Sequence, residues 1–376
     1  MTALDTGEFP SMKSMTPRER LLTAIDLGVP DRVPASVHQW QPYHLKKYMN
    51  GLSELEAFRY CGLDASLGVF AAKPVEDPNW KVEVVNLPAP EGETNVQRII
   101  TTPEGQLEYT ISSNEITGFM TTHPVKRKED IYLIDKYMPT PPLDAAEYKR
   151  RADEMGDDGI VRTCVWGEQG GPWQDAVSLH GTTEMIMAAA DDPDWVFAFL
   201  DILWNKKEKW MKENLPGLPV DLVETGGGAA SSTVISPRYF RKFCTPYDVK
   251  MHDLLHEMGF RVVYHTCGGM MPILEMIVEN HCDAAETLTP PSMGGDARPQ
   301  ELKERIGDKV SLIGGVDQSN VLEVGTREQI FAHVRELFET YGKNGGYVMS
   351  PSDHFFHVPL ENMLIYAEAA RECVYG

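Results

Sequence analysis

A regular alternation of strand-like and helix-like segments is the feature of this sequence that most constrains its fold. Apolar runs typical of buried parallel strands occur at residues 31–37, 65–70, 159–166, 220–224, 260–265, 283–288, 309–313 and 346–349. Helical patterns accompany them, and the last covers residues 360–374. Eight strand–helix units predict an α/β protein of the (β/α)8 TIM-barrel type rather than an open sheet.

The chain is predicted to form one domain, residues 15–376, preceded by a flexible arm at residues 1–14. The domain begins with a strong helix start, in which Thr16 is the N-cap and Pro17 takes the first helical position. Glu19 completes a capping box with Thr16. This helix therefore precedes the first predicted strand.

The pattern changes between residues 80 and 122. Four strand-like runs follow one another without helices, and a Thr-Pro-Glu-Gly turn at residues 102–105 joins two of them. We therefore predict an antiparallel β-meander inserted into the barrel. The simplest interpretation is that this insertion lies on the surface and has no catalytic or binding role.

Composition excludes several classes of function. The formal charge of −21 over 376 residues argues against binding to nucleic acid or to an anionic membrane. The chain start has no apolar signal core, and no run of 18 apolar residues occurs. Six scattered cysteines do not form a disulfide framework, so we expect a cytoplasmic protein. A homodimer is left open.

Polar side chains gather where the predicted strands end. In barrels of this type the active site lies at the carboxyl ends of the strands. These ends supply His38, Trp166, Glu224, Gly227, His265, Cys267, Glu286, Asp317, Asp353 and His354, and most of these side chains can bind a metal ion or transfer a proton. We take Glu224, Asp317 and His354 as candidate catalytic residues. These strand ends carry many acidic residues and few cations, and a bound metal ion would compensate their negative charge.

His265 and Cys267 stand one residue apart at the end of a buried strand, and imidazole with thiolate suits zinc. The pair alone also fits a buried cysteine beside an ordinary histidine. Glu286, at the next strand end, is the expected third ligand, although it could instead be a hydrogen-bonding acid. Asp353 is the preferred fourth ligand. Alternatively, Asp353 and His354 form a carboxylate–imidazole pair for proton transfer.

The remaining candidates would shape a substrate pocket. His38 and Trp40 follow the first strand, and Trp166 and Trp173 follow the third, where they could wall an aromatic site. Gly227, in a run of three glycines, would let a flat ligand approach the backbone. The sequence has neither a serine nucleophile elbow nor a phosphate-binding loop.

Several segments resemble the uroporphyrinogen decarboxylase superfamily over nearly the whole chain. They are Thr-Pro-Arg-Glu-Arg from residue 16, Pro-Asp-Arg-Val-Pro from residue 30, Ile-Gly-Gly-Val-Asp from residue 313 and Pro-Leu-Glu-Asn from residue 359. The decarboxylases carry an arginine-rich segment after the first strand. Here residues 36–40 read Ser-Val-His-Gln-Trp, without arginine, so decarboxylation of a polyanion is not expected.

His265 and Cys267 resemble instead the His-x-Cys pair of the zinc- and cobamide-dependent methyltransferase branch. That branch has a further cysteine in Ser-Pro-Gly-Cys-Gly, and this chain reads Ser-Pro-Ser-Asp-His from residue 350, so Asp353 stands in its place. Replacing sulfur by carboxylate makes zinc harder and better suited to an oxygen ligand.

The resemblance implies methyl transfer with Zn²⁺ and with cobalamin carried by a partner corrinoid protein. From the altered ligand we predict that the methyl group is transferred from oxygen to the cob(I)alamin of that partner. The tryptophans favour methoxylated aromatic compounds as substrates. His354 would protonate the departing oxygen. The alternatives are a methylcobamide:thiol methyltransferase, a decarboxylase of a small substrate, and a metal-free binding scaffold.

Overall fold

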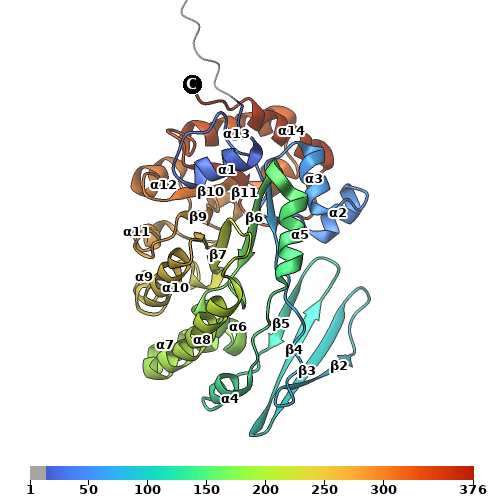
Figure 1. Cartoon of the computed structure of the whole chain (residues 1–376), viewed down its shortest axis with the longest axis vertical. Helices are drawn as coiled ribbons and strands as arrows, with labels where there is room; N and C mark the ends of the chain where they lie inside the picture. Colours follow the sequence, from blue (N-terminus) through green and yellow to red (C-terminus); the bar gives the residue numbers. More distant parts are fainter. Residues whose placement is uncertain (1–13) are drawn as a thin grey trace, which may run out of the picture.

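A computed structural model describes residues 14–376, so the predicted arm lies almost entirely outside the described residues. Its centre is a curved sheet of seven parallel strands in the order β1-β6-β7-β8-β9-β10-β11 (Figure 1). The strands are β1 (Ala65–Gly68), β6 (Gly159–Cys164), β7 (Leu222–Gly226), β8 (Arg261–His265), β9 (Ala284–Thr287), β10 (Ser311–Val316) and β11 (Tyr347–Pro351). The order follows the sequence, as parallel strand–helix units require.

The first of the eight predicted strands, at residues 31–37, does not form as a regular strand. Ala35 makes an isolated parallel bridge to Met349 of β11, and the Ser36 amide donates to the Met349 carbonyl at 2.9 Å. On the other side, the Asp64 amide donates to the Ala35 carbonyl at 2.8 Å. Pro34 has no amide hydrogen to extend a ladder. The closed eight-stranded barrel is therefore not confirmed.

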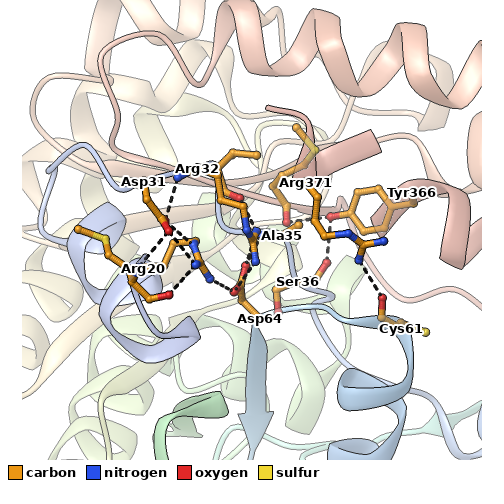
Figure 2. A network of polar contacts seen from close by, with 12 residues as sticks. Arg20, Asp31, Arg32, Ala35, Ser36, Cys61, Asp64, Tyr366 and Arg371 are labelled. Atoms are coloured by element: carbon orange, nitrogen blue, oxygen red, sulfur yellow. Dashed lines mark hydrogen bonds and ion pairs between the residues drawn. The ribbon is translucent and has the colours of Figure 1, made fainter. Parts of the chain in front are cut away.

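Buried charges hold this segment in place (Figure 2). The Asp64 carboxylate is fully buried and accepts hydrogen bonds from Arg20, Arg32 and the amide of Ala35. Tyr366 donates across the same region to the carbonyls of Ser36 and Met349. Because a buried carboxylate is stable only when paired and hydrogen-bonded, these contacts tie the segment to its neighbours.

Helices surround the sheet. They are α1 (Pro17–Ile25), α2 (Pro42–Tyr48), α3 (Glu54–Cys61), α4 (Asp130–Tyr137), α5 (Ala145–Met155), α6 (Pro172–His180), α7 (Thr182–Asp191), α8 (Pro193–Asn214), α9 (Pro237–Tyr239), α10 (Thr245–Glu257), α11 (Leu274–Glu279), α12 (Pro299–Ile306), α13 (Arg327–Thr340) and α14 (Leu360–Arg371). The capping box of Thr16 and Glu19 forms as predicted. A π-helical turn (Phe240–Cys244) separates α9 from α10. None of the helices in residues 14–376 combines the length and apolar character needed to cross a membrane.

The meander predicted at residues 80–122 forms a separate four-stranded antiparallel sheet. Its strands are β2 (Lys81–Leu87), β3 (Thr94–Thr102), β4 (Gly105–Ser113) and β5 (Gly118–Thr122). It lies beside α4 and α6, at the opposite end of the molecule from α1 (Figure 1).

The interior of the curved sheet has an apolar floor. A separate core cluster joins one inward residue from each of six strands, Ile160, Leu222, Val263, Ala284, Ile313 and Val348, to Leu21, Ala24 and Ile25 of α1. The first helix thus closes the amino end of the sheet. Functional side chains are left to the opposite, carboxyl end.

Candidate metal centre

A polar layer lies directly above this apolar floor. Strand side chains alternate between faces, so the residue two positions after each floor residue also points inward. On four neighbouring strands these residues are Arg162 of β6, Glu224 of β7, His265 of β8 and Glu286 of β9. The strand period therefore brings four charged or metal-binding side chains into one layer.

His265 and Glu286 are the centre of this layer. The Nδ1 atom of His265 lies 3.0 Å from Oε1 of Glu286, and both side chains are almost fully buried. Arg162 donates to Glu286 at 2.8 Å and to Glu224 at 2.9 Å. The guanidinium thus neutralises part of the charge of two buried carboxylates.

Contacts within the layer favour the charged forms of Glu286 and His265. Burial alone would raise the pKa of Glu286, but Arg162 and His38 hold that pKa well below its ordinary value. Burial alone would lower the pKa of His265, whereas contacts with Cys267 and Glu286 raise it well above the ordinary value. A negative environment therefore surrounds the His265 ring, and it would favour a cation at this position.

His265, Cys267 and Asp353 offer ligand atoms that lie within 4.8 Å of one another. The Nε2 atom of His265 is buried and has no hydrogen-bond partner in the described chain. A histidine that binds zinc through one nitrogen commonly donates its other ring N–H to a carboxylate, which is the position of Glu286. The donor set and the unpartnered nitrogen thus fit a zinc ion.

Glu286 belongs to a second cluster, formed with His38, Glu224 and His265. Its Oε1 atom contacts Arg162 and His265, while its Oε2 atom is buried without a hydrogen-bond partner. The sequence predicts Glu286 as a direct metal ligand. Its contact with Nδ1 of His265 favours a different role, in which Glu286 orients the His265 ring.

Two further histidines line the same region. The ring centre of His38 lies 5.2 Å from those of both His265 and His354. The His354 Nε2 atom lies 3.2 Å from Oε1 of Gln39. Burial and the neighbouring His38 lower the pKa of His354, which favours its neutral ring. The structure therefore places His38 between His265 and His354, and the functional roles of His38 and His354 remain predictions.

The glycine run after β7 allows a close approach between backbone and ligand residues. Gly227 has a φ of +141°, and its amide donates to the His265 carbonyl at 2.8 Å. A Cβ atom on Gly228 would lie 2.6 Å from Sγ of Cys267. Any side chain at Gly228 would displace the thiol, so glycine is needed beside Cys267.

Two other candidates, Asp317 and Trp40, have contacts typical of structural residues. Asp317 accepts hydrogen bonds from Ser292 and from the backbone and side chain of Asn320, as a helix cap does. Trp40 is 1% exposed and packs against Phe58 and Phe355. The structure does not bring these two side chains into the metal-binding clusters. Their functional roles remain predictions.

The two tryptophans after β6 differ in their surroundings. Trp173 is buried, stacks on Phe243 and donates to the Ala229 carbonyl at 3.1 Å. Trp166 is partly exposed, and the ammonium of Lys207 lies 5.5 Å from its ring centre. Trp166 is thus the better placed of the two to contact a substrate.

Sequence reasoning missed Arg162 and expected few cations at the mouth. The sequence did contain a sign of this role, because Arg162 interrupts the apolar strand β6, where a charged side chain requires buried partners. Gln39 was also missed, although it stands between two predicted site residues.

Comparisons with known proteins agree with this architecture. The family model described as "Uroporphyrinogen decarboxylase (URO-D)" matches residues 100–373. A methylated-thiol–coenzyme M methyltransferase of Methanosarcina mazei is 22% identical over 381 residues, which cover 96% of this chain and 90% of that relative. A uroporphyrinogen decarboxylase of Aliivibrio salmonicida is 32% identical over 238 residues, which cover 59% of this chain and 61% of that relative.

A solved structure described as "methyltransferase from Methanosarcina mazei" has a TM-score of 0.64 against this chain. The superposition covers 95% of this chain and 99% of the other, at 17% sequence identity. This likeness supports the fold of the whole chain.

Proposed function

Because the chain belongs to the uroporphyrinogen decarboxylase family, we propose that it is a zinc-dependent methyltransferase of that family. It would move a methyl group from the oxygen of a methoxylated aromatic compound to the cobalamin of a partner corrinoid protein. The observation that carries this proposal is the cluster of His265, Cys267 and Asp353 at the carboxyl end of the sheet.

Two observations favour methyl transfer over decarboxylation. The methyltransferase relative aligns over 96% of this chain, whereas the decarboxylase of A. salmonicida aligns over 59%. Residues 36–40 contain no arginine that could bind the acidic arms of a porphyrinogen, and Arg162, the arginine of the polar layer, is already paired with Glu224 and Glu286.

When bound, zinc would supply a Lewis acid for the ether oxygen, and the partner's corrinoid would supply the acceptor for the methyl group. His265, Cys267 and Asp353 would hold the metal, and Glu286 would orient His265. The carbon–oxygen bond breaks, and the oxygen that leaves with the electron pair takes up one proton. His354, placed beside Asp353, is the candidate that relays this proton from solvent, because its lowered pKa favours a neutral ring that takes up one proton as it passes one on.

The choice of an oxygen-linked methyl group depends on Asp353. A carboxylate in place of a second thiolate makes the metal a harder acid, which binds oxygen better than sulfur. Trp166 would contact the aromatic ring of the substrate. Methyl transfer to or from a thiol is the second candidate, and it is supported by the name of the M. mazei relative.

A reconstituted assay tests this proposal. The zinc-loaded protein would be mixed with a corrinoid protein reduced to cob(I)alamin and with a panel of methoxylated aromatic compounds. Formation of methylcobalamin, followed by its absorption spectrum, with release of the free phenol is expected. A protein that methylates a thiol from methylated corrinoid protein, but does not demethylate any ether, would select the second candidate.

A further inference from the structure

A cavity separate from the metal-binding cluster lies under the four-stranded meander. Its volume is about 220 Å³, and it lies between one face of the meander, α4 and the end of α6. Most of its lining is apolar and includes Trp80, Ile100, Leu107, Met120, Ile134 and Leu179. This cavity contains none of the proposed metal ligands.

The cavity continues into an exposed apolar strip of the same sheet face. Directly paired residues of antiparallel strands point to one face, and Val82 pairs with Ile100 while Val84 pairs with Arg98. Val82 is 49% exposed and Val84 is 56% exposed.

Arg98 is the one cationic side chain in the lining. It is an exposed residue and has no ion-pair partner among residues 14–376. Its Nη1 atom lies 3.5 Å from the hydroxyl of Tyr109, which is also in the lining. An unpaired guanidinium beside an apolar cavity is complementary to a ligand with one carboxylate and an apolar body.

We propose that this cavity binds an aromatic carboxylate, with its ring between the meander and α4 and its carboxylate on Arg98 and Tyr109. The ring would be buried against Trp80, Leu107 and Met120, and the carboxylate would accept hydrogen bonds from Arg98. Planar guanidinium and carboxylate groups match in two parallel hydrogen bonds.

The cavity is linked to the metal centre by α6. The end of this helix supplies Leu179 to the cavity lining, and near its start Gln174 accepts a hydrogen bond from the Ala229 amide. Ala229 follows Gly228, the glycine beside Cys267. The proposed binding site does not depend on methyl transfer, because it shares no residue with the metal centre.

Titration calorimetry with 4-iodobenzoate on the full-length protein tests the proposal. We expect one site per chain with a sub-millimolar Kd. Arg98→Gln should weaken binding about tenfold, whereas Arg59→Gln, a surface arginine paired with Asp158, should leave it unchanged. Val82→Asp should also weaken binding, because it adds a like charge at the rim, and Val324→Asp serves as its exposed control.

A Cys267→Ala variant separates this site from the metal centre. The proposal predicts unchanged binding in that variant and iodine anomalous density beside Trp80 in crystals soaked with the probe. Loss of binding in Cys267→Ala with retention in Arg98→Gln would overturn it, because the ligand would then occupy the metal centre. A wild-type dimer that Val84→Asp dissociates, with no binding of the probe, would assign the strip to a second copy and also overturn it.

Discussion

Nδ1 of His265 lies 3.0 Å from the carboxylate of Glu286, and Nε2 of the same ring is buried without a hydrogen-bond partner. One nitrogen is thereby engaged by a carboxylate, and the other is left for a ligand. Arg162 donates to the same Oε1 atom of Glu286 at 2.8 Å. The polar layer of the sheet thus prepares His265 to bind a metal together with Cys267 and Asp353.

Glu286→Gln should weaken zinc binding about 10- to 100-fold, because the amide orients and polarises His265 less well than the carboxylate does. Competition with a chromophoric chelator measures this change. Glu91→Gln, on the exposed meander surface, is the matched control and should bind zinc like the wild type. Equal affinity in both variants would mean that Glu286 does not orient a metal ligand.

Asp353→Cys should shift the preferred methyl carrier from oxygen to sulfur. The variant would hold zinc by two sulfur ligands, and a softer, more electron-rich metal favours a thiolate. We expect the rate with methoxylated aromatic compounds to fall by at least about tenfold and methyl transfer to a thiol to increase. Both rates are measured with the same corrinoid protein. An unchanged ratio would remove the argument for an oxygen-linked methyl group.

Asp64→Asn should destabilise the fold strongly, because it leaves the charges of Arg20 and Arg32 without their buried carboxylate. Breaking a buried ion pair from one side typically costs about 3–5 kcal/mol. Denaturant unfolding measures the loss. Asp158→Asn, which removes an exposed pair with Arg59, should cost less than about 1 kcal/mol. Similar losses for both variants would contradict the role of Asp64.

The buried carboxyl group of Asp248 should make the free energy of unfolding depend on pH. Burial raises the pKa of this carboxyl from 3.8 to about 7, and its Oδ2 atom has no hydrogen-bond partner in the described chain. Because the folded state prefers the protonated acid, the free energy of unfolding should fall as the pH rises from about 4 to about 7, by on the order of 4 kcal/mol at most.

Thermal or denaturant unfolding at several pH values, compared with Asp248→Asn, measures this dependence. The amide cannot ionise, so the variant should lose the decrease between pH 4 and pH 7 and should be more stable than the wild type at pH 8. Parallel pH profiles for the two proteins would show that Asp248 is not the group responsible.

Much of the architecture could be predicted from local patterns. The end of β8 at His265 and the meander are visible because apolar periodicity and turn residues are local signals. The segment around Ala35 has the same apolar pattern but does not form a regular strand. Its pairing depends on Pro34 and on the buried network of Asp64, which involve contacts distant in the sequence.

Site residues that lie at the ends of strands could be predicted from the sequence, whereas the other residues of the candidate site could not. Arg162 contacts Glu224 and Glu286, which are 62 and 124 positions away in the sequence. All of β6 except its last residue is buried, so the strand pattern does not reveal which face Arg162 occupies. Similarly, no pattern separates Trp40, packed in the core, from the partly exposed Trp166.

The central claim is that His265, Cys267 and Asp353 hold a zinc ion, because the proposed methyl transfer depends on that metal. Measuring the zinc content and recording the X-ray absorption spectrum at the zinc edge tests this claim most directly. We predict one zinc per chain, with one sulfur ligand at about 2.3 Å and the remaining nitrogen and oxygen ligands at about 2.0–2.2 Å. The sulfur signal should disappear in Cys267→Ala. A protein that binds no zinc, or zinc without a sulfur ligand, would contradict the proposed metal centre.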